Sequence, residues 1–162
     1  MLRLEGACHC GAVRFSVSSR TPVPYMHCYC SICRKTAGGG GSAINIMGEA
    51  ESLRVTGKES LGVYRARGAG EDPEALSELR RHFCQTCGSQ LYISDPRWPQ
   101  WVYPHASAID TPLPRPNERS HIMLGSKPDW VALPEGAHEL RFEGYPDASI
   151  EDWHRIRGLL EG

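Results

Sequence analysis

The residues of this chain best suited to chemistry are its seven cysteines, which fall into three short groups along the sequence. The groups have the spacings C-x-C, C-x-C-x-x-C and C-x-x-C, and their members are Cys8 and Cys10, then Cys28, Cys30 and Cys33, then Cys84 and Cys87. Buried cysteines are common as small core residues, but core packing does not require such regular spacing. We therefore interpret all three groups as metal-binding segments.

Local backbone geometry explains why these spacings suit a metal ion. Side chains at i and i+2 of an extended chain lie on one face, so a C-x-C pair can hold one ion. A C-x-x-C turn brings two sulfurs together, and Gly88 after Cys87 allows the tight backbone that such a turn needs. Gly11 after Cys10 is expected to serve the same purpose.

The number of thiols predicts one closed site and one open site. Structural zinc is nearly always four-coordinate, whereas catalytic zinc has three protein ligands and one open position. We therefore expect the outer pairs, Cys8 and Cys10 with Cys84 and Cys87, to form a structural zinc site that contributes directly to folding. Cys28, Cys30 and Cys33 would hold a second zinc with an open position, and they are the candidate catalytic residues.

Composition limits the classes of protein to consider. The 162 residues predict a single domain spanning 1–162, and the net charge of -1 gives no basic field for nucleic acid. The first residues lack the apolar run of a signal peptide, and no stretch approaches the ~20 apolar residues of a membrane span. We expect a cytoplasmic protein without a membrane or nucleic-acid partner. In that reducing compartment, clustered thiols favour metal binding over disulfides.

Alternation of apolar and polar residues predicts a mainly β fold. Strands are expected around residues 13–17, 42–47, 52–57, 61–66, 90–94, 101–109 and 121–125. Residues 68–78 are polar and contain Gly and Pro, which predicts a surface loop, and the prolines in 110–120 exclude a helix or central strand there. The one predicted helix covers about 149–160, where Ser149 and Asp152 resemble a capping box.

Four segments together carry a resemblance to a known family. "GACHCGAVRF", "HCYCSICRKTAGG", "FCQTCGSQL" and "HIMLGSKPDW" are similar to the glutathione-dependent formaldehyde-activating enzyme family, which includes centromere protein V. The resemblance implies an Mss4-like, zinc-stapled β-sheet fold with the two zinc sites divided as above. Residues 131–162 would form a C-terminal extension that carries the predicted helix.

The resemblance also implies an activity. It suggests a zinc-dependent carbon–sulfur lyase that handles a glutathione–formaldehyde adduct or a similar thiol conjugate, with glutathione as co-substrate. Three thiolates weaken the Lewis acidity of a zinc ion, which favours thiol exchange over hydrolysis. Arg34 and Lys35 could bind a glutathione carboxylate, and Gly39 in the glycine run could present a backbone N–H to an anion. The resemblance makes His121 a fourth candidate substrate contact.

Two neighbouring histidines and two other functions complete the expectations. His27 is a less favoured fourth ligand for the second zinc, and His9 should face away from the first. A non-catalytic, zinc-stabilised binding or carrier module is the main alternative function. A thiol redox protein using Cys30 and Cys33 is less favoured, because such pairs usually lie at a helix N-terminus and no helix is expected there.

Overall fold

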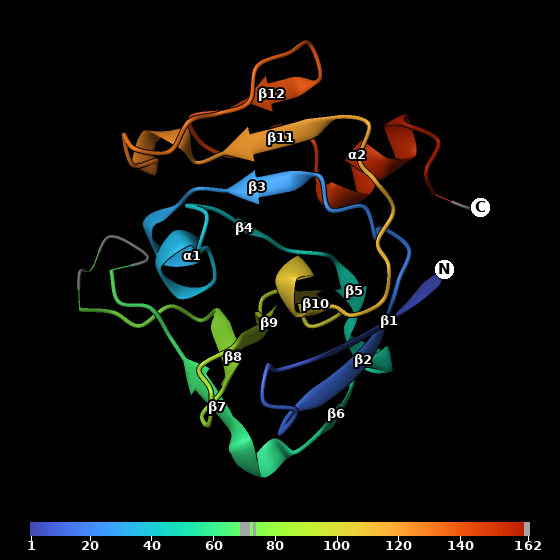
Figure 1. Cartoon of the computed structure of the whole chain (residues 1–162), viewed down its shortest axis with the longest axis vertical. Coiled ribbons are helices and arrows are strands. Elements are labelled where there is room, and N and C mark those ends of the chain that lie inside the picture. The colour runs from blue at the N-terminus through green and yellow to red at the C-terminus, as the bar shows by residue number, and fades with distance from the viewer. Residues whose placement is uncertain (69–71, 73, 161–162) are drawn as a thin grey trace.

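The structure is a computed structural model that describes residues 1–68, 72 and 74–160. Its strands form three sheets, shown in Figure 1. The first joins, in order, β1 (Leu2–Ala7), β2 (Arg14–Ser19) and β6 (Arg54–Thr56). The second joins β5 (Gly48–Glu49), β10 (Trp101–Pro104), β9 (Gln90–Ser94), β8 (Arg80–Cys84) and β7 (Leu61–Tyr64). The third joins β12 (Glu139–Arg141), β11 (Arg119–Ile122), β3 (Met26–Cys28) and β4 (Ala43–Ile44).

The first two sheets are antiparallel and share the main apolar core. Alternate residues of the β1–β2 hairpin, such as Leu4 and Phe15, pack there with Leu91 and Val102 from the second sheet. Period-two alternation correctly predicted β2, but β1 was not predicted. Two antiparallel sheets buried against a common core confirm the mainly β fold class.

The third sheet contains the parallel strands of the fold. β11 pairs in parallel with both β3 and β12, whereas β3 and β4 are antiparallel. Because β12 lies within residues 131–162, this C-terminal segment completes the sheet that contains Cys28. Figure 1 shows this sheet at one end of the molecule, with the C-terminal helix beside it.

The C-terminal helix α2 covers Ile150–Ile156 and begins as predicted. The Ser149 hydroxyl accepts a hydrogen bond from the backbone N–H of Asp152 at 3.1 Å, which caps the first turn. The helix ends before the predicted residue 160 because Gly158 adopts a left-handed backbone with φ 66°. Trp153 stacks on Tyr25 with ring centroids 3.7 Å apart, which holds α2 against the segment before β3.

A second helix, α1 (Ser31–Thr36), lies inside the central cysteine segment, where the sequence predicted none. Three strand predictions are shortened by turns of 3-10 helix at Ala50–Ser52, Ala106–Ala108 and Leu124–Ser126. The described part of 68–78 is mostly exposed, as predicted. The exclusion of a central strand from 110–120 holds only as far as residue 118, because Arg119 and Ser120, which follow the last proline of this stretch, begin the central strand β11. Neither helix in the described ranges has the length and apolarity to cross a membrane.

Candidate metal centres

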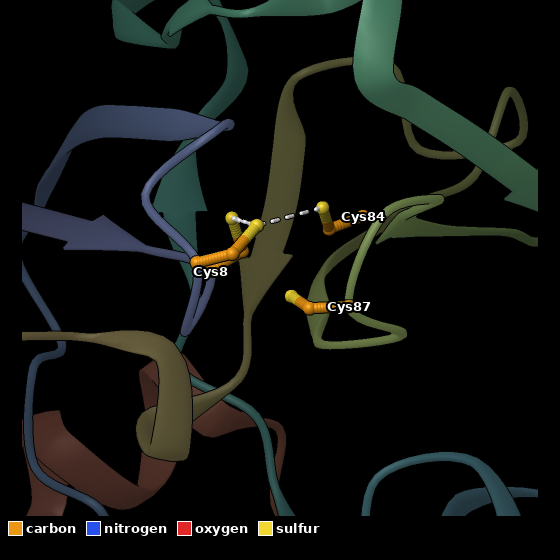
Figure 2. A group of neighbouring side chains, drawn as sticks. Cys8, Cys84 and Cys87 are labelled. Atoms are coloured by element: carbon orange, nitrogen blue, oxygen red, sulfur yellow. Dashed lines mark hydrogen bonds between the residues drawn. The ribbon is translucent and has the colours of Figure 1, made fainter.

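The two outer cysteine pairs meet at one point, as their spacing predicted (Figure 2). Cys8 and Cys10 come from the β1–β2 hairpin, and Cys84 and Cys87 from the β8–β9 hairpin. The four sulfurs lie within 4.8 Å of one another, with 3.5 Å between Cys8 and Cys10 and 3.7 Å between Cys10 and Cys84. Tetrahedral Zn–S bonds of about 2.3 Å place sulfurs roughly 3.8 Å apart, so this donor set fits a single ion.

The backbone of both hairpins is shaped around the sulfurs. Gly11 and Gly88 each have φ 76°, a left-handed conformation that glycine adopts without strain, which confirms the predicted tight turns. The Val13 N–H donates to the Cys8 sulfur at 3.2 Å, as expected for a thiolate acceptor. A hydrogen bond from the Ser89 hydroxyl lowers the pKa of Cys87 to about 5, which favours the form that binds metal.

The three central cysteines form a separate cluster. Cys28 ends β3, Cys30 is the N-cap of α1 and Cys33 lies within that helix, and their sulfurs lie within 4.8 Å of one another. Cys28 and Cys33 are buried, whereas Cys30 is half-buried. Hydrogen bonds with Cys28 and Cys33 lower the pKa of Cys30, whereas hydrogen bonds with Cys30 and Cys33 raise the pKa of Cys28. The cluster therefore favours a thiolate at Cys30, stabilised by its two neighbours.

Helix α1 is stabilised by local contacts that leave no hydrophobic period in the sequence. The Cys30 sulfur accepts a hydrogen bond from the Cys33 N–H at 3.3 Å, so a thiol takes the place of a usual Ser or Asp cap. The Cys30–Cys33 pair therefore does lie at a helix start, contrary to the sequence-based expectation. However, β3 and β4 on either side of α1 are antiparallel, unlike the parallel βαβ setting of thioredoxin-like sites.

A buried arginine compensates the charge of the three-thiol cluster. Arg81 on β8 is 5% exposed, and its guanidinium donates to the Cys33 sulfur at 3.8 Å. It makes no ion pair with a carboxylate among the residues described. Because an unpaired buried charge costs several kcal/mol, this position indicates that the sulfur cluster is anionic. Sequence reasoning missed Arg81, since its contact to Cys33 spans 48 residues.

A surface groove of about 770 Å³ separates the four-thiol hairpins from the last turn of α1. Arg34, Lys35 and Gly39, three of the predicted substrate contacts, line this groove together with Arg14 from β2. None of the three cations forms an ion pair with any residue in the described ranges. The groove therefore has a positive surface, and Asp110 supplies the one carboxylate among the described residues that line it.

The fourth predicted substrate contact, His121, lies elsewhere. Its side chain is buried, its Nδ1 bonds the Tyr29 hydroxyl at 3.0 Å and its Nε2 bonds Glu139 at 2.8 Å. Both ring nitrogens thus have protein partners, and neither is left for a substrate. His27 stacks beside His121 and is not part of the three-thiol cluster, while His9 lies exposed outside the four-thiol cluster.

Comparisons with known proteins identify relatives of this chain. The family model described as glutathione-dependent formaldehyde-activating enzyme matches residues 3–125. A Halomonas elongata protein whose name provisionally assigns it to these enzymes is 55% identical over 159 residues, covering 98% of this chain and 99% of its own. A crystal structure of a Rhodobacter sphaeroides protein is 27% identical with a TM-score of 0.52, over 68% of this chain and 91% of that one. This chain belongs to the glutathione-dependent formaldehyde-activating enzyme family.

Proposed function

We propose that this protein is a zinc-dependent carbon–sulfur lyase that acts on a glutathione–formaldehyde adduct or a similar thiol conjugate. Zinc on Cys8, Cys10, Cys84 and Cys87 is structural, and a second zinc on Cys28, Cys30 and Cys33 marks the reaction site. Glutathione is the co-substrate. Its abundance in reducing compartments agrees with the seven free thiols of the chain and with a cytoplasmic location.

The observation that carries this proposal is the difference between the two sulfur clusters. The cluster of Cys8, Cys10, Cys84 and Cys87 has four sulfur donors, enough for a complete tetrahedral site. The cluster of Cys28, Cys30 and Cys33 has three donors, one fewer than a tetrahedral site needs. The fourth position of the second cluster suits one external sulfur. When bound there, zinc would supply a Lewis acid that lowers the pKa of a substrate thiol.

The residues of the chain around this cluster have matching roles. Arg81 donates to Cys33, which offsets part of the negative charge of the thiolates and keeps the site able to accept one more anionic sulfur. In the lyase direction, the carbon–sulfur bond of the hydroxymethyl conjugate breaks and its electron pair stays on sulfur. The hydroxyl group loses its proton to solvent and becomes the carbonyl of formaldehyde, and the thiolate regains a proton on release.

The cationic groove is the proposed site for the rest of the thiol substrate. Arg34 directly follows Cys33 in the helix, so this end of the groove is formed by residues next in sequence to the three-thiol cluster. Glutathione carries two carboxylates, which Arg34, Lys35 and Arg14 would bind by charge-assisted hydrogen bonds. The exposed Gly39 backbone adds an N–H donor at the same end of the groove.

Thiols add to formaldehyde without an enzyme, so formation of the adduct alone does not test the proposal. The test is whether the protein makes the exchange between formaldehyde and the adduct faster than the uncatalysed reaction, which NMR exchange spectroscopy measures. ¹³C-formaldehyde and glutathione are mixed at equilibrium, and the rate of interconversion with the adduct is measured by NMR with and without protein. The proposal expects acceleration by the zinc-loaded protein and its loss in Cys30→Ser. An unchanged rate with the parent protein would instead favour the carrier alternative, provided that glutathione still binds.

A further inference from the structure

A row of polar side chains, Asn45, Arg81 and His105, contains four buried atoms that have no hydrogen-bond partner among the described residues. The unpartnered atoms are Oδ1 of Asn45, Nε of Arg81 and both ring nitrogens of His105. Arg81 is 5% exposed and His105 is 1% exposed, so bulk solvent does not satisfy these groups. Each such atom costs about 1–3 kcal/mol unless a ligand or water completes it.

Strand register places this row on the cysteine side of the sheets. Cys28 on β3 pairs with Ala43 on β4, and both belong to the small apolar cluster that contains Cys33. Asn45 follows Ala43 by two residues in extended chain, so its side chain projects from the same face. Asn45 in turn forms an antiparallel bridge with His105, whose side chain is therefore its cross-strand neighbour.

Arg81 connects the row to the sulfur atoms. Its guanidinium donates to the Cys33 sulfur through one terminal nitrogen, and its Nε–H remains unused. Burial, followed by the positive charge of Arg81, lowers the pKa of His105 to about 4. Arg81 therefore lies within electrostatic reach of both groups, and at neutral pH His105 is an uncharged imidazole with one N–H donor and one acceptor nitrogen.

We infer that Asn45, Arg81 and His105 form a subsite for the oxygen atom on the substrate carbon that is bonded to sulfur. The inference rests on the proposed function, which places that sulfur at the three-thiol cluster. The ligand class is a one-carbon hydroxyl or carbonyl group. Its oxygen accepts hydrogen bonds from the Arg81 Nε–H and the His105 N–H, and a hydroxyl proton is donated to Asn45 Oδ1.

This subsite stabilises the charge that develops during the reaction. In the addition direction, the thiolate forms the carbon–sulfur bond, the carbonyl π electrons move to oxygen, and the oxygen then takes a proton from solvent. Two fixed donors at that oxygen lower the barrier because the oxygen is more negative in the transition state than in formaldehyde. Cleavage passes through the same transition state, so both directions benefit equally.

The test compares His105→Leu, which removes both ring nitrogens, with His105→Gln, which keeps a donor and an acceptor. Loss of one oxyanion donor reduces enzyme rates by about 10²–10³-fold, and we expect at least about a tenfold loss of kcat in His105→Leu with partial rescue in His105→Gln. Zinc content and the glutathione dissociation constant should not change. Asn45→Leu is the second variant, and His154→Leu is the control for removing a buried histidine outside the proposed subsite.

A spectroscopic readout separates this inference from the proposed function. In ¹⁵N-histidine-labelled protein, the His105 ring signals, assigned by their absence in His105→Leu, should shift with glutathione plus formaldehyde but not with glutathione alone. A parent protein that accelerates exchange, with an equally fast His105→Leu variant and unshifted ring signals, would overturn the inference and leave the proposed function standing. Shifted ring signals without acceleration would support the subsite and overturn the lyase.

Discussion

The Cys10 sulfur lies 3.7 Å from the Cys84 sulfur, which connects two hairpins separated by 74 residues in the sequence. Each hairpin supplies two thiols, so a metal ion at this point would close a long chain loop. Such an ion would stabilise the contact between the first and second sheets. The three-thiol cluster closes only the short segment from Cys28 to Cys33, and its effect on stability should be smaller.

The first prediction concerns metal and stability. Cys84→Ser should lose one zinc per chain and most of the folded population, because structural zinc contributes on the order of 10 kcal/mol to folding. Cys30→Ser should lose the other zinc and retain cooperative unfolding. Elemental analysis and thermal denaturation of the two variants measure both effects. Equal loss of stability in the two variants would contradict the division into structural and reactive sites.

The second prediction concerns the cationic groove. Arg34→Gln and Lys35→Gln should each raise the KM for glutathione by about tenfold, since a charge-assisted hydrogen bond is worth about 1.5–3 kcal/mol. Cysteamine, a thiol without a carboxylate, should be used equally well by parent and variants. Lys58→Gln is the matched control, because Lys58 is exposed and lies outside the groove. An equal effect on both thiols would exclude carboxylate binding by these side chains.

The third prediction uses two neighbouring glycines. A Cβ on Gly38 would lie 2.5 Å from the Ser42 carbonyl oxygen, whereas a Cβ on Gly39 meets no atom within 4 Å. Gly38→Ala should therefore lower the melting temperature, and Gly39→Ala should leave it unchanged. Gly39→Ala keeps the backbone N–H and should bind glutathione normally, whereas Gly39→Pro lacks this donor and should bind it more weakly, which calorimetry would measure. Normal glutathione binding by a stable Gly39→Pro variant would remove this N–H from the site.

The fourth prediction concerns the pH dependence of the C-terminal helix. His154 is buried, its Nδ1–H donates to the Ile150 carbonyl at 2.7 Å, and its Nε2 accepts from the Val23 N–H at 3.4 Å. Burial lowers the pKa of His154 from its ordinary value of 6.5. The undocked helix therefore binds protons more readily, so docking is fully stable above pH 6.5 and weakens as pH falls below it.

Hydrogen exchange of the α2 amides, corrected for its intrinsic pH dependence, measures this effect. Protection of α2 should decrease between pH 7.5 and 5.5, whereas protection of the β1–β2 hairpin serves as the internal reference. Parallel changes in both regions would show global destabilisation by metal loss instead of helix undocking. Constant protection of α2 over this range would contradict the assigned role of His154.

The features predicted correctly are those that depend on residues close together in the sequence. The spacing of Cys84, Cys87 and Gly88 encodes a tight turn, and the number of thiols sufficed to pair this turn with Cys8 and Cys10. The capping residues of α2 are adjacent in sequence, so its start was predicted correctly. The spacing and number of the cysteines therefore predicted which residues form each sulfur cluster.

The missing parts depend on contacts between distant segments. Helix α1 has six residues, too few to show a helical period, and a thiol caps it. Arg81 and His105 follow no motif, because Arg81 contacts Cys33 across 48 residues of sequence and His105 pairs with the distant Asn45. His121 was named as a candidate substrate contact, although a hydrogen-bonded core histidine was the favoured interpretation, and its hydrogen bonds to Tyr29 and Glu139 agree with the core position.

Anomalous diffraction at the zinc edge, from crystals of the zinc-loaded protein, tests the central claim most directly. The account predicts two metal peaks per chain. The first should have four cysteine sulfurs, and the second should have Cys28, Cys30 and Cys33 with a fourth ligand that does not come from the protein. A single peak, or a second metal whose fourth ligand is a protein side chain such as His27, would contradict the open site.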